Sequence, residues 1–112
     1  MGARLALIII IFTSNGCAGL TFLTGNDSLH PCLFQYDGVA QSVCIAGDFN
    51  QWRSDTHCLR PNKGIWAIRL LLPSGTHRYA FIIDRNRWVT DPKALYTEND
   101  GFGRKNSVVV IE

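Results

Sequence analysis

The chain is 112 residues long, 46% hydrophobic and 18% charged, and its formal net charge is +2. This length accommodates one ordinary domain, because single domains cluster around roughly 100 to 150 residues. The composition is globular, and so small a net charge argues against an electrostatic surface for nucleic acid. We therefore expect one folded unit and no nucleic-acid partner.

Residues 1–18 have the layout of a secretory signal. Arg4 precedes the apolar run 5–12, and small and polar residues follow as far as Ala18. The apolar run is about eight residues long, whereas a helix that crosses a bilayer needs about 20. The segment therefore predicts export; the alternative is a buried N-terminal helix.

Two processing routes are open at the end of this segment. Ser14-Asn15-Gly16-Cys17 resembles a bacterial lipobox, in which a small residue precedes a cysteine that is acylated and becomes the new N-terminus, although Ser14 stands where Leu is usual. Alternatively, Gly16 and Ala18 satisfy the small-x-small rule for cleavage after Ala18. The first route predicts a cell-envelope lipoprotein that touches the membrane only through a lipid on Cys17. The second predicts a periplasmic or secreted protein.

Three cysteines, Cys32, Cys44 and Cys58, follow the signal segment, and an odd number cannot all pair within one chain. An oxidising compartment permits a disulfide, and Cys32 could face Cys44 across a hairpin. The alternative is that all three are small, half-buried apolar residues. No CxxC or Cys/His ligand spacing occurs, so we expect no metal and no cofactor.

The remainder of the chain predicts a linker, 19–29, and one all-β domain, 30–112. Thr, Gly, Asn, Asp and Ser dominate residues 21–29. After them, alternating apolar patterns and turn signals recur about every ten residues, as in a β-sandwich. Asp37-Gly38 is a hairpin signal between the first two strands. The expected strands are 32–36, 42–46, 65–72, 77–84 and 107–111.

Two packed sheets would bury one face of each strand. The residues expected in this core are Val43, Ile45, Phe49, Trp66, Ile68, Leu70, Tyr79 and Phe81. Trp52 and Trp88 are not assigned to this core, because both lie in polar, turn-rich stretches. One interpretation is that each packs, partly buried, at the edge of the sandwich. The other is that the two rings are flat platforms for the apolar C–H face of a sugar ring.

Five segments carry a resemblance to a known family. They are 43–52, 64–66, 72–84, 88–92 and 103–107, and they occur in the family's order and spacing. From about Pro31 to Ile111 the chain resembles the family 48 carbohydrate-binding modules. These include the glycogen-binding domain of the AMP-activated protein kinase beta subunit and the N-terminal domains of isoamylases and branching enzymes. The resemblance implies a single immunoglobulin-like (early-set) antiparallel β-sandwich.

The resemblance also implies an α-1,4-glucan ligand, such as glycogen, starch or maltodextrin, and the residues that hold it. Trp52 and Trp88 fall on the family's two stacking platforms. Phe102 corresponds to the bulky residue that enters the curve of the glucan, and Asn106 to the asparagine that bonds sugar hydroxyls. Arg104, between them, would contribute side-chain or backbone contacts.

Two features depart from the family pattern, and the first of them predicts weaker binding. Ala80 stands where the kinase subunit has a lysine, so one charged hydrogen bond, typically about 1.5 to 3 kcal/mol, would be lost. The stretch 84–88 is one residue longer than the family's tight turn, which changes the expected height of the Trp88 ring. Arg85 or Arg87, on that turn, is a candidate replacement for the lysine.

Three functions follow from these observations. The first is a non-catalytic α-glucan-binding module, with a glucan-active enzyme as a further partner. The second is an envelope interaction module that kept the fold and lost the sugar. The third is an accessory domain of a glycoside hydrolase of the α-amylase type. We expect no catalytic residue in this chain, because Asp48, Asp55, Asp84 and Asp91 lie on separate turns, whereas glycoside hydrolysis needs two carboxyl groups about 5 to 10 Å apart.

Overall fold

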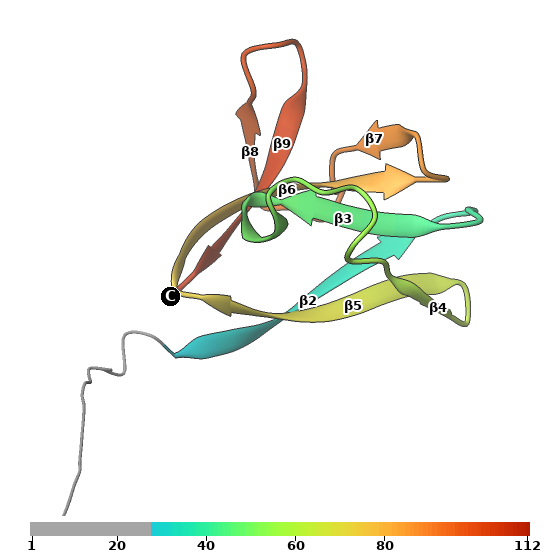
Figure 1. The fold of residues 1–112 in the computed structure, drawn as a ribbon, viewed down its shortest axis with the longest axis horizontal. Helices are drawn as coiled ribbons and strands as arrows, with labels where there is room; N and C mark the ends of the chain where they lie inside the picture. The colour runs from blue at the N-terminus through green and yellow to red at the C-terminus, as the bar shows by residue number, and fades with distance from the viewer. Residues whose placement is uncertain (1–27) are drawn as a thin grey trace, which may run out of the picture.

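A computed structural model describes residues 28–112, which form two antiparallel β-sheets packed as a sandwich (Figure 1). The expected all-β sandwich is therefore confirmed. The signal segment 1–18, the lipidation candidate Cys17 and nearly all of the linker 19–29 lie outside the described residues. Within residues 28–112, no helix has the length and apolarity to cross a membrane.

The smaller sheet has the strand order β2 (Leu29–Asp37), β5 (Ile65–Pro73) and β4 (Arg60–Asn62). The larger sheet has the order β3 (Val43–Gly47), β6 (Gly75–Ile83), β9 (Lys105–Ile111) and β8 (Tyr96–Asn99), and β7 (Arg87–Val89) pairs with β6. A short 3-10 turn, η3 (Asp48–Asn50), follows β3. The long central strand β6 therefore connects the elements of the larger sheet (Figure 1).

The hairpin expected at Asp37-Gly38 is wrong. β2 pairs along its whole length with β5, and β3 pairs with β6, so residues 38–42 carry the chain from one sheet to the other. With the two strands in opposite sheets, Phe34 of β2 and Ile45 of β3 fill the same core from both sides. A turn signal marks where the chain reverses, but it does not specify which strand the next one joins.

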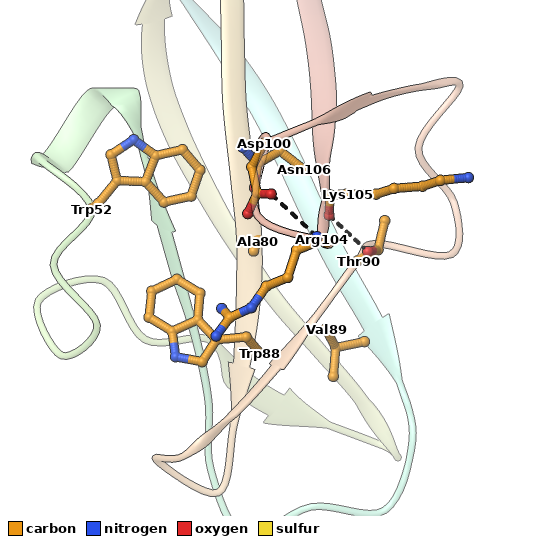
Figure 2. A pocket seen from close by; sticks show the side chains of 10 residues that line it. Trp52, Ala80, Trp88, Val89, Thr90, Asp100, Arg104, Lys105 and Asn106 are labelled. Carbon is orange, nitrogen blue, oxygen red and sulfur yellow. Dashed lines mark hydrogen bonds between the residues drawn. The ribbon is translucent and has the colours of Figure 1, made fainter.

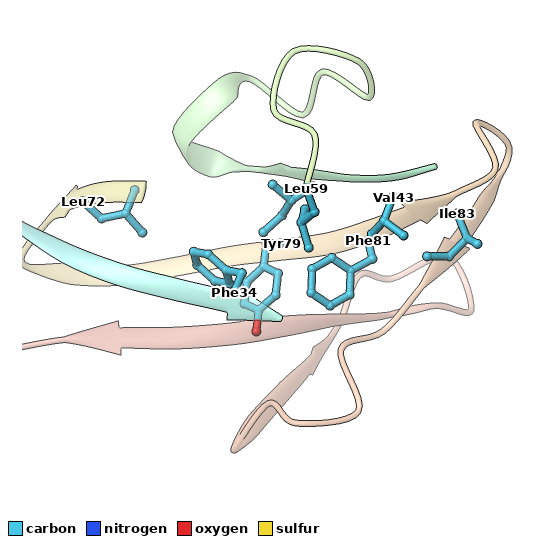
Figure 3. Packing of buried hydrophobic residues seen from close by; sticks show 8 residues of the cluster. Phe34, Val43, Leu59, Leu72, Tyr79, Phe81 and Ile83 are labelled. Carbon is cyan, nitrogen blue, oxygen red and sulfur yellow. The ribbon is translucent and has the colours of Figure 1, made fainter. Parts of the chain in front are cut away.

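The core lies between the sheets and is built around aromatic side chains (Figure 3). Of the eight expected members, Val43, Ile45, Tyr79 and Phe81 are buried, and the others pack against them half-buried. The Phe34 and Tyr79 rings meet edge to face, with centroids 4.9 Å apart. Sequence reasoning missed four buried members of this cluster: Phe34, Leu59, Leu72 and Ile83.

The outer face of β6 is buried as well as the inner face. Ala80 and Ile82, which alternate with the core residues, are only 5% and 0% exposed. Trp88 of β7 lies directly opposite Ile82, and Ala46 of β3 lies opposite Ala80. The outer surface of the larger sheet is therefore covered near β6, and the candidate site is found there.

The disulfide joins Cys44 to Cys58, not Cys32 to Cys44. Cys44 and Cys58 face each other across an isolated antiparallel bridge, whereas Cys32 lies on β2 in the other sheet. Within residues 28–112, Cys32 has no disulfide partner, and its partial burial raises the pKa of its thiol. Two of the three cysteines therefore close the loop between β3 and β4.

Candidate functional site

A groove of about 570 Å³ lies on the outer face of the larger sheet (Figure 2). Three chain segments far apart in the sequence form it: the loop after β3, the β6–β7 hairpin and the β8–β9 hairpin. The lining residues are Trp52, Ala80, Trp88, Val89, Thr90, Asp100, Gly103, Arg104, Lys105 and Asn106.

Trp52 stands on a tightly turned loop. Gln51 and Trp52 both have left-handed backbones, with φ of 56° and 58°, and the Trp52 amide donates to the Gly47 carbonyl over 3.0 Å. The indole Nε1 donates to Asp48 Oδ1 over 3.1 Å, while Asp48 Oδ2 accepts the Arg78 amide over 3.0 Å. The ring is thus tied to β6 through one carboxylate.

The inside of this loop is held by Asn50, which is 4% exposed. Its Oδ1 accepts the Gly47 amide over 3.0 Å, and its Nδ2 donates to the Ile45 carbonyl over 3.0 Å. The Cys44–Cys58 disulfide closes the base of the same loop. The platform at Trp52 therefore rests on a loop that is fixed from within, since a buried amide with satisfied partners resists rearrangement.

Trp88 is placed by the β6–β7 hairpin. The hairpin turns through Asp84 and Arg85, which both have positive φ, as the central residues of a type I′ turn do. Asp84 Oδ1 accepts the amides of Gln41 over 2.7 Å and Ser42 over 3.2 Å, which fixes the turn to the neighbouring loop. The turn is therefore left-handed, and the Trp88 side chain faces the groove with 37% of its surface exposed.

The third wall is the β8–β9 hairpin. Asp100 Oδ1 accepts the amides of Phe102 over 2.7 Å and Arg104 over 3.2 Å, and Gly101 and Gly103 supply the positive φ angles that this loop needs. The Arg104 Cζ lies over the Trp88 ring, 5.7 Å from its centroid. A cation at this distance over an aromatic face makes a cation–π contact, so Arg104 and Trp88 form one side of the groove together.

Four of the five expected site residues line the groove together: Trp52, Trp88, Arg104 and Asn106. The fifth, Phe102, does not line it; it projects from the hairpin tip with 90% of its surface exposed. Figure 2 shows Ala80 between the two indoles, where it forms the floor of the groove. Arg85 and Arg87, the candidate replacements for a lysine there, are not among the lining residues.

Sequence reasoning missed Asp100, Thr90 and Lys105 as lining residues. The pattern Asp100-Gly101-Phe102-Gly103 is a turn signal that could have indicated the first of them. Thr90 Oγ1 donates to the Lys105 carbonyl over 2.9 Å and thereby joins the β7 segment to β9. Within residues 28–112, no group of three or more His, Cys, Asp or Glu side chains is arranged to hold a metal ion.

The family model described as the glycogen recognition site of AMP-activated protein kinase matches residues 30–112. The chain belongs to this family. The match begins one residue after the start of β2 and includes every wall of the groove. The chain therefore carries a domain of the glycogen-recognition family, built on the sandwich described above.

Relatives of the glycogen-recognition family share about a third of the aligned residues. The chain is 30% identical to the pig AMP-activated protein kinase subunit beta-1 over 82 residues, which cover 73% of this chain and 64% of the pig sequence. It is 32% identical to the cattle beta-1 subunit over 73% of this chain and 29% of the subunit. The mouse beta-2 subunit is 34% identical over 55% of this chain and 22% of the subunit. The chain thus spans less than two thirds of these relatives.

The fold also matches a solved structure. The maltogenic amylase from S. marinus superposes with a TM-score of 0.61 over 78% of this chain and 14% of the amylase, at 18% sequence identity. At this identity the match shows a shared fold.

Proposed function

We propose that this chain is a non-catalytic module that binds α-1,4-glucan in the groove between Trp52 and Trp88. The observation that carries the proposal is that two indoles from separate chain segments open onto one groove in a domain of the glycogen-recognition family. The description of the family as a glycogen recognition site and the name of the amylase are consistent with a ligand of glycogen or starch type.

Each residue of the groove has a chemical role in this proposal. The indole faces of Trp52 and Trp88 remove the apolar C–H surface of two glucose units from water, which supplies most of the affinity. The Asn106 amide both donates to and accepts from sugar hydroxyls, and Arg104 donates a charge-assisted hydrogen bond. Phe102 stands at the rim, where it would meet the curve of a longer glucan.

Binding to one short glucan is expected to be weak. The groove is open, so only one side of the ligand loses its water, and the immobilised rings offset part of the gain. Ala80 at the floor contributes no polar contact from its side chain. Several sites on one polymer, or a partner enzyme with its own glucan site, would raise the effective affinity without any new contact in this domain.

The carboxylates near the groove argue against hydrolysis. Asp100 is the only carboxylate among the lining residues, and its Oδ1 is occupied by two backbone amides. Both glycosidase mechanisms need a pair of carboxyl groups on the two sides of one bond. We therefore propose that any reaction on the bound glucan is performed by a separate partner.

The proposal includes export. The signal-like residues 1–18 support it, and so does the Cys44–Cys58 disulfide, which suits an oxidising compartment. Acylation at Cys17 would anchor the module in the cell envelope, and cleavage after Ala18 would release it. Mass spectrometry of the N-terminal peptide distinguishes the two, because only acylation adds the mass of a lipid, and Cys17→Ser would abolish that addition.

Tryptophan fluorescence tests the binding site. The purified protein is titrated with maltoheptaose, alongside Trp52→Ala, Trp88→Ala and the control Trp66→Phe, whose ring packs half-buried against the core. We expect saturable quenching in the wild type and the control, and a loss of about tenfold or more in affinity in each alanine variant, because one aromatic platform is worth about 1 to 3 kcal/mol in comparable stacking sites.

Cello-oligosaccharide serves as the ligand control. It has the same monomers in a flat chain, whereas an α-1,4-glucan is curved, and it should give no response. If the wild type shows no fluorescence change with millimolar maltoheptaose and does not sediment with insoluble starch, the α-glucan proposal is wrong. The domain would then be an interaction module, a function that the replacement of the family's lysine by Ala80 would favour.

A further inference from the structure

The groove holds an arginine that has no anionic partner in the domain. Arg104 and Lys105 both line the groove, and Arg104 forms no salt bridge within residues 28–112. By contrast, Arg78 pairs with Asp48 and Glu98, and Lys93 pairs with Asp37. The guanidinium of Arg104 therefore contacts the proposed sugar platform and has no carboxylate partner within residues 28–112.

The carboxylates near the groove do not neutralise this cation. Asp100 points its Oδ1 at the amides of Phe102 and Arg104. Asp48, beneath Trp52, accepts the indole Nε1 on one oxygen and the Arg78 amide on the other, with the Arg78 guanidinium 3.6 Å away. Neither acid forms a salt bridge with Arg104, so its guanidinium is free to contact a ligand.

The position of Arg104 suits an anion carried on a stacked sugar. Its Cζ lies over the Trp88 ring, 5.7 Å from the centroid, so a glucose unit that stacks on this ring comes within reach of the guanidinium. An uncharged amide or hydroxyl side chain is sufficient to hydrogen-bond the neutral hydroxyls of a sugar. A guanidinium adds a planar pair of donors that matches the oxygens of a phosphate in a bidentate, charge-assisted contact.

We propose that the groove prefers α-glucan that carries phosphate monoesters over neutral α-glucan, and that Arg104 is the residue that contacts the phosphate. The inference rests on the proposed function, since it assumes that a glucose unit stacks on Trp88. It adds the chemical class of the preferred ligand and the residue that determines the preference.

The test compares two ligands on the purified full chain. Maltoheptaose and its singly phosphorylated form are titrated into the wild type, Arg104→Gln, Arg104→Lys and the control Arg69→Gln, whose side chain is exposed on β5 of the smaller sheet. We expect the phosphorylated sugar to bind the wild type about tenfold more tightly, as one charge-assisted contact allows. The ratio of the two affinities should fall toward one in Arg104→Gln, stay intermediate in Arg104→Lys and be unchanged in Arg69→Gln.

Two outcomes would overturn the inference and leave the proposed function standing. One is equal binding of both sugars to the wild type; the other is a preference that survives Arg104→Gln. A third arm uses glucose 6-phosphate, because binding of this monosaccharide as tightly as the phosphorylated heptasaccharide would mean that the phosphate alone is the ligand. If neither heptasaccharide binds, the proposed function fails and the inference fails with it.

Discussion

Asp91 shows how one side chain serves both the backbone and the core. Its Oδ1 accepts the Lys93 amide over 2.8 Å, which confirms the turn-forming role expected from the sequence. Its Oδ2 accepts the Tyr79 hydroxyl over 2.6 Å inside the sandwich. The second contact could not be predicted, because it depends on how β6 and the segment after β7 are placed in space.

Tyr79→Phe is expected to lower the free energy of unfolding by about 1 to 3 kcal/mol, because it leaves a buried carboxylate oxygen of Asp91 without its donor. Urea unfolding at pH 7 measures the effect. Tyr36→Phe is the matched control, since Tyr36 is only half-buried and its hydroxyl forms no hydrogen bond within residues 28–112. Equal losses in the two variants would contradict the role given to the Tyr79–Asp91 contact.

Tyr79 also makes the stability of the folded state depend on pH. Burial and the hydrogen bond to Asp91 raise the pKa of Tyr79 above its ordinary value. Above about pH 10 the unfolded chain loses this phenolic proton while the folded chain keeps it, so ionisation favours unfolding. The stabilisation of the folded state by Tyr79 is therefore fully present below about pH 10 and declines above it. Thermal unfolding from pH 8 to 11 should show a smaller alkaline decline in Tyr79→Phe than in the wild type, and equal declines would refute this account.

Some strands have a local sequence signal that predicts them, and others form only by pairing with a neighbouring strand. β2, β3, β5, β6 and β9 were expected within a few residues of their ends, because their apolar alternation is a local signal. β4, β7 and β8 were missed, because each has only three or four mostly exposed residues. These short strands form by hydrogen bonding to a long neighbour, and two of them, β7 and β8, bear or flank the walls of the groove.

The disulfide is expected to support the glucan site through the Trp52 loop. It closes a segment with a sequence separation of 14, and Cys58 is exposed to reductant. The double variant Cys44→Ala/Cys58→Ala should lose about 3 kcal/mol of stability, the usual value for a loop of this length. It should also bind maltoheptaose more weakly, because the Trp52 platform gains freedom that binding must remove. Urea unfolding and calorimetric titration measure the two effects.

Cys32→Ala, on the opposite sheet, is the control and should keep the wild-type affinity for maltoheptaose. If the double variant also binds as tightly as the wild type, the Asn50 hydrogen bonds alone hold the loop. The disulfide would then stabilise the fold without contributing to the site.

At the scale of the whole molecule, the two outer faces of the sandwich differ. The larger sheet carries the groove, whereas the smaller sheet presents exposed leucines such as Leu33 and Leu71. The resemblance to a known family indicated which residues to examine, but the assembly of the groove from three distant segments is a property of the fold. For that reason neither the contact of Arg104 with Trp88 nor the position of Phe102 outside the lining was foreseen.

The most direct test of the central claim uses the three indole N–H signals of the protein in a heteronuclear NMR titration with maltoheptaose. Trp52 and Trp88 line the groove, and Trp66 packs against the core on the other sheet as an internal control. The account predicts that the Trp52 and Trp88 signals shift together along one saturation curve while the Trp66 signal stays in place. Shifts confined to Trp66, or no shift at a saturating sugar concentration, would contradict the placement of an α-glucan in this groove.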